Sequence, residues 1–195
     1  MPVTINGNGS ITGLSVGGLG SGVVNTATLA DGAATGIKQG AGSVIQCITD
    51  TTSAKVTNQT TSYVDTGLLV TMTPRAANSK FFAICDIHFF VDFGGAGSSN
   101  PHGLGYNLYK DGTRFTTSLY DGSAGESNEN PYDYYTDGSS RTNYRFQKQG
   151  QGTFGSTSAA AFTVKFKGYN GSPLVQMHLT ANQTQAQLTV MEIAV

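Results

Sequence analysis

The sequence predicts an all-β protein, in which a β-sandwich or jelly-roll-like C-terminal domain follows a glycine-rich, extended N-terminal segment. Two observations lead to this prediction. Short apolar runs alternate with a period of two residues and are separated by turn-forming residues at regular spacing, which is typical of sandwiches. Glycine accounts for 26 of the 195 residues and charged residues for only 12% of the chain, against roughly 25% in an average soluble protein. Such a composition does not suit a helical enzyme.

The charge balance excludes two classes of partner. Lys and Arg total 11 and Asp and Glu total 12, so the net charge is -1. Because no basic stripe is available to neutralise phosphates, we expect no nucleic-acid partner. The N-terminus lacks the basic flank and apolar core of a signal peptide, and no apolar run reaches the roughly 18 residues of a membrane span. We therefore expect synthesis in the cytoplasm and no membrane insertion.

Residues 1–42 form a separate N-terminal segment, in which single aliphatic residues stand between glycines and small polar residues. Alone, such a segment buries too little apolar surface to offset the entropy lost on ordering. We expect other chains to supply the missing surface, either sister copies or other proteins. Residues 26–37 fit a helical turn, an extended segment or a linker. The candidate attachment residues are Ile5, Ile11, Leu14, Val16 and Leu19.

The domain over residues 43–195 begins with two predicted strands. The first opens with Val44, Ile45, Cys47 and Ile48, and the second runs from residue 63 to residue 73, where Pro74 ends it. We expect both cysteines, Cys47 and Cys85, to be small buried hydrophobes. Their spacing matches no CxxC or metal motif, and a disulfide between them stays open.

The strongest predicted strand covers residues 80–93. Period-two alternation divides it into two faces. One face is mixed and holds Phe82, Ile84, Asp86, His88 and Phe90. The other face is wholly apolar, so we expect it to line the core, and it holds Phe81, Ala83, Cys85, Ile87, Phe89 and Val91.

The later strands are predicted over residues 106–109, 115–119, 143–147, 161–169, 174–180 and 187–194. The first two flank Asp111-Gly112, a dipeptide that strongly favours a tight hairpin. The last strand is so apolar that we expect it in the middle of a sheet, where its loss would unfold the domain.

A loop insert over residues 94–142 is rich in Gly, Ser, Asn and Tyr. Tyrosine provides rigid contact area at low entropic cost, and Asn, Ser and Asp provide adaptable hydrogen bonds. Loops on a rigid β scaffold often carry binding sites, so we expect a contact with a host glycan or protein. A solvated loop or a subunit contact is the alternative, and the 93–102 loop is a second candidate. The proposed contact residues are Tyr120, Glu126, Asn128, Tyr132, Tyr134 and Tyr135.

We predict no catalytic residues, no cofactor and no metal. Glycoside hydrolysis needs two carboxylates at a fixed separation, and a loop rich in glycine and serine does not hold them rigidly. No calcium-loop spacing occurs, and the three histidines at positions 88, 102 and 178 lie too far apart to indicate a zinc site. The carboxylates considered for catalysis are Glu126, Glu129, Asp133 and Asp137.

Several segments, taken in order, resemble the C-terminal β-domain of bacteriophage fibre proteins, especially cyanophage-like tail and head fibres. They are TSYVDTGLLVTMTPR at 61–75, NSKFFA at 78–83, NLYKDG at 107–112, FTVKF at 162–166 and LTVMEIA at 188–194. The start, VTINGNGSITGL at 3–14, is similar to the virion-proximal end of such proteins. The chain departs from them by its short length and by the 94–142 insert.

The resemblance implies a virion protein that is assembled in the host cytoplasm. It implies a homotrimer that attaches to other virion proteins through its N-terminal segment and displays the β-domain outward. We therefore expect a fibre-type subunit that contacts the host surface. The alternatives are a capsid decoration protein that stabilises the shell, a glycan-degrading tailspike-like enzyme and a bacterial lectin-like module.

Overall fold

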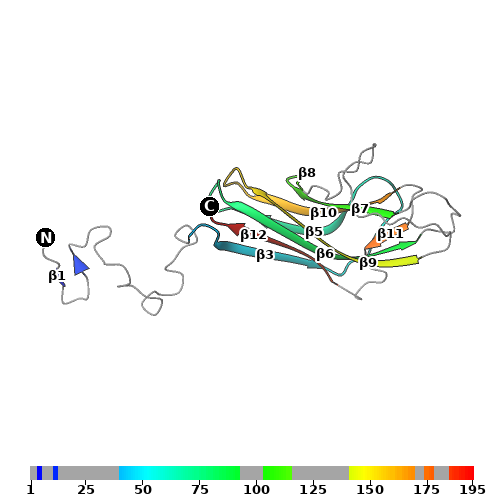
Figure 1. The fold of residues 1–195 in the computed structure, drawn as a ribbon, viewed down its shortest axis with the longest axis horizontal. Coiled ribbons are helices and arrows are strands. Elements are labelled where there is room, and N and C mark those ends of the chain that lie inside the picture. Colours follow the sequence, from blue (N-terminus) through cyan, green and yellow to red (C-terminus); the bar gives the residue numbers. More distant parts are fainter. Residues whose placement is uncertain are drawn as a thin grey trace.

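The structure is a computed structural model that describes residues 4–5, 11–12, 40–92, 103–115, 141–169, 174–177 and 185–195. Every regular element in these ranges is a β-strand (Figure 1). None of these residues belongs to a helix that could cross a membrane. Near the N-terminus, β1 (Thr4–Ile5) and β2 (Ile11–Thr12) form an antiparallel pair. The other strands form two antiparallel sheets, which confirms the predicted sandwich.

The first sheet, here named sheet I, is built around the long strand β6. One edge of β6 pairs with the whole of β9. Its other edge pairs with β12 over residues 80–86 and with β11 over residues 89–92. On the sides of β12 and β11 that face away from β6, β3 pairs with β12 and β4 pairs with β11. The strands are β3 (Val44–Thr52), β4 (Val56–Asn58), β6 (Lys80–Asp92), β9 (Arg141–Thr153), β11 (Leu174–Met177) and β12 (Ala186–Ile193).

The second sheet, sheet II, has the order β5-β10-β7-β8. Its strands are β5 (Val64–Met72), β7 (Gly103–Lys110), β8 (Thr113–Arg114) and β10 (Ala160–Tyr169). After β4 the chain changes sheet at every connection except β7 to β8 and β11 to β12. Strands that are neighbours in the chain therefore face each other across the core, as in a jelly roll.

The core lies between the two sheets. All six inward residues predicted for β6 are buried, and the opposite face of β6 is partly exposed except at Phe90, so the predicted alternation is confirmed. Aromatic rings join the layers: Phe81 lies 5.0 Å from Phe162 and Phe89 lies 5.2 Å from Phe166, measured between ring centroids. Each such pair adds about 0.5–1.5 kcal/mol to the stabilisation from buried area.

The predicted hairpin at Asp111-Gly112 is present between β7 and β8. Both residues have positive φ, 49° and 77°, as a tight two-residue turn requires. The Asp111 carboxylate also accepts the backbone N–H of Ala161 at 2.8 Å. That hydrogen bond holds the pKa of Asp111 below its usual value. β8 ends at Arg114, and residues 116–119 of the predicted second strand lie outside the described residues.

Strand β9 is longer than the sequence pattern predicts. It continues past residue 147 to Thr153, along the whole of β6. In this additional stretch, glycines take the inward-facing positions where a strand pattern would show apolar residues, so the sequence gives no strand signal. One of them, Gly152, lies under the ring of Phe81. A Cβ at Gly152 would lie 2.6 Å from a ring carbon of Phe81. The missing side chain therefore makes room for a core aromatic.

On each of the two open sides of the sandwich, a side chain of sheet I forms a hydrogen bond with a backbone group of sheet II. On one side, Asp50 of β3 accepts the N–H of Leu69 in β5 at 2.8 Å. On the other side, Lys148 of β9 donates to the carbonyl oxygen of Tyr106 in β7 at 2.8 Å. Each contact engages one backbone group of a strand edge, a kind of edge that can otherwise pair with another chain.

The last strand, β12, lies between β3 and β6, so its predicted central position is confirmed. Its end is tied to the start of the domain, because Gly42 N–H donates to the carbonyl of Ala194 and Ala194 N–H donates to the carbonyl of Ser43, both at 2.9 Å. The start of β3 and the C-terminus consequently lie at the same end of the sandwich (Figure 1).

The prediction for the cysteines is only half right. Both are free; Cys85 is buried, but Cys47 is exposed. Cys47 lies on the outer face of β3, an edge strand of sheet I, and its register partner is Met191. No second layer covers that face within the described residues, so an apolar run did not imply burial there.

Candidate functional site

The residues proposed for host contact lie outside the described residues. These are Tyr120, Glu126, Asn128, Tyr132, Tyr134 and Tyr135. The 93–102 loop, the loop carboxylates, and the histidines at 102 and 178 also lie outside them. Within the predicted 94–142 insert, residues 103–115 carry the β7–β8 hairpin, so this part of the insert belongs to sheet II.

The proposed attachment residues are described only in part. Ile5 and Ile11 are register partners in the antiparallel β1–β2 pair. Leu14, Val16 and Leu19 lie outside the described residues. The structure therefore pairs two of the five proposed attachment residues across β1 and β2.

The outer face of sheet II carries a group of tyrosine and lysine side chains that the sequence analysis did not single out. We name it the sheet II cluster, and it consists of Tyr63, Asp65, Asn107, Tyr109, Lys165 and Lys167. The strand register of sheet II brings these residues together. Lys165 lies between Asp65 on β5 and Asn107 on β7. Two residues further along β10, Lys167 lies opposite Gly105.

The two tyrosines of the cluster meet edge to face. The ring centroids of Tyr63 and Tyr109 lie 6.0 Å apart with an interplanar angle of 72°. Both rings are partly exposed. Each also lies beneath an ammonium group: Lys167 over Tyr63 at 5.2 Å and Lys165 over Tyr109 at 5.4 Å. At partly exposed sites such a cation–π contact is worth about 0.5–1 kcal/mol.

Asn107 links the cluster through hydrogen bonds to Tyr63 and Lys148. It is completely buried. Its amide nitrogen donates to the hydroxyl of Tyr63 at 2.8 Å, and its amide oxygen accepts from Lys148 at 2.8 Å. Because both the nitrogen and the oxygen of the amide are hydrogen-bonded, Asn107 holds the side chain of Tyr63 in a fixed orientation over the sheet.

The charge at the sheet II cluster is positive. Lys165 and Lys167 contribute two positive charges, and Lys148 approaches the cluster at the edge of β7. Asp65 contributes one negative charge. Asp65 lies 3.5 Å from Lys165, and the side chain of Asp65 is 58% exposed. In water such a pair is screened and weak, so an anion from solution can compete with Asp65 for Lys165. This part of the described surface therefore favours anions.

The outer face of sheet I has a different character. We name it the sheet I face, and two neighbouring rows across its strands carry no charged residue. One row is Gln151, Phe82, Met191 and Cys47. The next row is Gln149, Ile84, Thr189 and Thr49. Phe82, Ile84 and Met191 are partly exposed, which gives the face an apolar centre between polar flanks.

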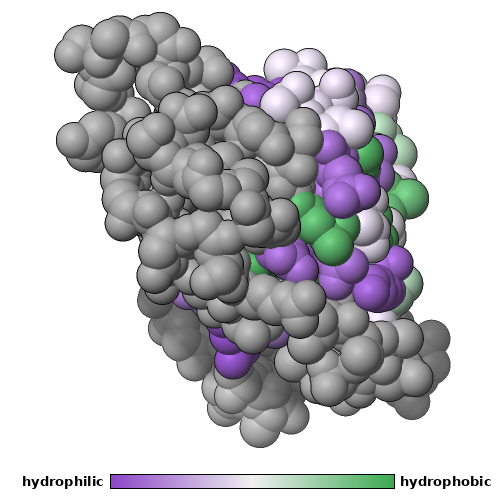
Figure 2. Space-filling model, turned by 90° about the vertical axis from the view of Figure 1, so that its right-hand side faces the viewer, coloured by the Kyte–Doolittle hydropathy of each residue, from purple (hydrophilic) through white to green (hydrophobic). Residues whose placement is uncertain are grey.

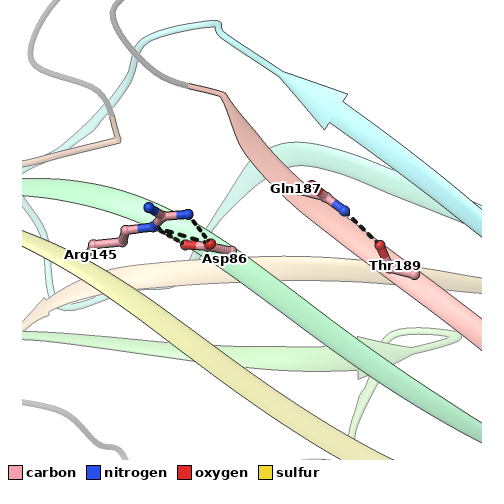
Figure 3. Close-up of polar contacts among 4 residues, drawn as sticks. All are labelled: Asp86, Arg145, Gln187 and Thr189. Atoms are coloured by element: carbon pink, nitrogen blue, oxygen red, sulfur yellow. Dashed lines mark hydrogen bonds and ion pairs between the residues drawn. The ribbon is translucent and has the colours of Figure 1, made fainter.

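Beyond the neutral rows lies an ion pair (Figure 3). The Arg145 guanidinium on β9 donates to both carboxylate oxygens of Asp86 on β6, and its Nε lies 2.9 Å from Oδ1. This hydrogen bonding lowers the pKa of Asp86 and raises the pKa of Arg145. On neighbouring β12, the amide of Gln187 donates to the Thr189 hydroxyl at 3.0 Å. The pair cancels its own charge, so it adds no net charge beside the two neutral rows.

Hydrophobic residues elsewhere on the described surface are scattered. At the end of the sandwich that Figure 2 presents, small hydrophobic areas are set among hydrophilic ones. The large exposed hydrophobic residues are Val44, Leu69 and Val195. In the part of the chain that the structure describes, no group of three or more His, Cys, Asp or Glu residues is placed to hold a metal ion.

One sequence signal could have revealed the sheet II cluster. In the 162–167 stretch, lysines at 165 and 167 alternate with core residues, which predicts that both lysines point outward from the same face. The contribution of Tyr63 and Asn107 carries no such signal, because the two residues are 44 positions apart in the chain.

No family model matches the chain, and no curated protein sequence matches it.

Proposed function

We propose that this protein is a structural, non-enzymatic subunit of a bacteriophage virion, of the fibre type, which is displayed on the particle and contacts the host surface. The observation that carries the proposal is the contrast between the two outer faces of the sandwich. The sheet I face has neutral rows with an apolar centre, and the sheet II cluster presents tyrosines and lysines. A displayed subunit needs one face to bury against neighbours and another to meet the outside.

The sheet I face supports assembly with identical copies. The cores of protein interfaces are depleted in charge, and a neutral face does not repel its own copy. We propose a homotrimer, in agreement with the fibre resemblance of five segments in series. The segment 1–42 would attach the trimer to other virion proteins through Ile5, Ile11, Leu14, Val16 and Leu19. Three copies of a weak host contact would gain avidity without a strong single site.

A capsid decoration protein is the second candidate, because a flat neutral face also fits against a shell. Antibody raised against the intact chain, bound to whole particles and viewed by electron microscopy, separates the two. We expect label at the ends of fibres. Label spread over the capsid lattice would favour the decoration protein. New reducing ends released from host polysaccharide by the purified protein would overturn the non-enzymatic assignment.

A further inference from the structure

We propose that the sheet II cluster binds an anionic saccharide, with Tyr63 and Tyr109 as the apolar contact and Lys165 and Lys167 as the anion contact. This inference rests on the proposed host contact and names its ligand class. It places that contact on a rigid sheet face rather than on the loops singled out by the sequence.

The two tyrosines supply the shape of the site. Their rings meet at 72° with centroids 6.0 Å apart, so they form a corner rather than a flat plate. A sugar ring has C–H groups on its faces and hydroxyls around its rim. It can therefore lie against an aromatic ring while its hydroxyls meet polar groups, and tyrosine presents both kinds of surface. The neighbouring Leu69, 52% exposed and opposite Thr163, extends the apolar part.

The lysines determine the charge of the ligand. Their ammonium groups lie 5.4 and 5.2 Å from the centroids of Tyr109 and Tyr63, so a ligand that touches a ring also comes close to a cation. Lys165 has its side chain 30% exposed, and its carboxylate partner Asp65 is 3.5 Å away. An anionic group on the ligand could replace Asp65 at this lysine. A carboxylate on a sugar ring combines the two required features.

The site is held in place before any ligand arrives. Asn107 is fully buried and is bound at both ends, to Tyr63 and to Lys148, at 2.8 Å each. All members lie on or next to paired strands of one sheet. A rigid site loses less entropy on binding than a loop that must become ordered.

A nucleic acid also combines anions with rings, but this site fits it less well. Stacked bases need flat aromatic platforms, whereas the rings of Tyr63 and Tyr109 meet at 72° and form a corner. Binding of single-stranded DNA is therefore an outcome of the test that would count against the proposal.

The test measures binding of the intact chain to immobilised polygalacturonate, with immobilised dextran as the neutral saccharide and oligo-dT as the nucleic acid. We expect binding to polygalacturonate that weakens as salt rises, and little binding to the other two. Lys165→Gln with Lys167→Gln should weaken polygalacturonate binding by about tenfold or more. Tyr109→Ala should weaken it as well.

Lys55→Gln is the matched control, because Lys55 is exposed between β3 and β4 and lies outside the cluster. It removes one charge and should leave binding within about twofold of wild type. Thermal unfolding of each variant verifies that it is folded. If Tyr109→Ala does not fold, it is replaced by Tyr109→Phe, which keeps the aromatic ring.

Three results would overturn the proposal: no binding by the wild type, equal binding to dextran or oligo-dT, or an equal loss in Lys55→Gln and the double lysine variant. The antibody experiment on whole particles is independent of this one. A fibre protein that fails to bind polygalacturonate would refute the saccharide site alone, and binding by a protein absent from virions would refute the virion role alone.

Discussion

The carboxylate of Glu192 accepts a hydrogen bond from the backbone N–H of Arg75 at 2.9 Å, although the two residues are 117 positions apart in the chain. Glu192 is completely buried in β12. Its other oxygen accepts from the Gln46 amide at 2.6 Å, and the same amide donates to the carbonyl of Thr73 at 2.8 Å. The last strand therefore anchors the start of β3 and the segment that follows β5.

The first prediction concerns this anchor. Glu192→Ala leaves the Arg75 N–H without its acceptor and removes one of the two acceptors of the Gln46 amide. Both hydrogen bonds are partly buried, and an unmet buried donor costs roughly 1–3 kcal/mol. We expect the free energy of unfolding in urea to fall by about that amount or more. Glu192→Gln keeps one oxygen acceptor and should cost less. Equal stability of wild type and Glu192→Ala would show that the anchor contributes nothing.

The second prediction concerns the close approach of Phe81 to Gly152. In Gly152→Ala, the new methyl group would lie 2.6 and 2.8 Å from two ring carbons, so the ring must move within a filled core. Such overpacking costs about 1–3 kcal/mol. Gly40→Ala is the control, since nothing lies within 4 Å of a Cβ there. Denaturant unfolding of both variants provides the measurement, and similar losses in the two would contradict the steric explanation.

The third prediction is a pH dependence that arises from Asp86. Arg145 lowers the pKa of Asp86 in the folded protein, so the unfolded state binds this proton more readily. The contribution to stability is complete above the ordinary aspartate value of 3.8 and is lost as pH falls through the lower, folded-state pKa. We expect the Tm of wild type to exceed that of Asp86→Asn at neutral pH, and the two values to converge in acid. A constant difference down to the lowest pH would exclude this linkage.

The fourth prediction concerns thiol reactivity. Burial raises the pKa of the Cys85 thiol to about 12, so little of the reactive thiolate forms at pH 8. Cys47 is exposed. We expect an alkylating reagent to modify Cys47 alone in the native chain and both cysteines after unfolding, as measured by mass spectrometry. Cys47→Ser should abolish native labelling, and modification of Cys85 before unfolding would contradict its burial.

The same reagent tests the assembly surface. Cys47 lies in one of the neutral rows of the sheet I face, opposite Met191. If copies associate through this face, Cys47 should react more slowly at protein concentrations where light scattering reports an oligomer than at concentrations where it reports a monomer. An oligomer in which Cys47 reacts at the monomer rate would place the contact elsewhere.

The sequence by itself determined the features that depend on local periodicity and turn chemistry. Alternation in β6 identified its core face, because neighbouring side chains of a strand point to opposite sides. Asp111-Gly112 identified the hairpin, because few other residues adopt two consecutive positive φ values. The apolar ending identified β12 as a central strand. Each of these properties is encoded within a few consecutive residues.

Only the tertiary structure decided the features that depend on distant partners. β9 continues through a stretch of glutamine and glycine because β6 supplies its hydrogen bonds and Phe81 fills the space above Gly152. Cys47 is exposed because it lies on the outer face of β3, an edge strand of its sheet. Tyr63 and Asn107 meet because β5 and β7 lie on either side of β10. Contacts between strands far apart in the chain leave no local pattern, so these features become visible only when the sheets are assembled.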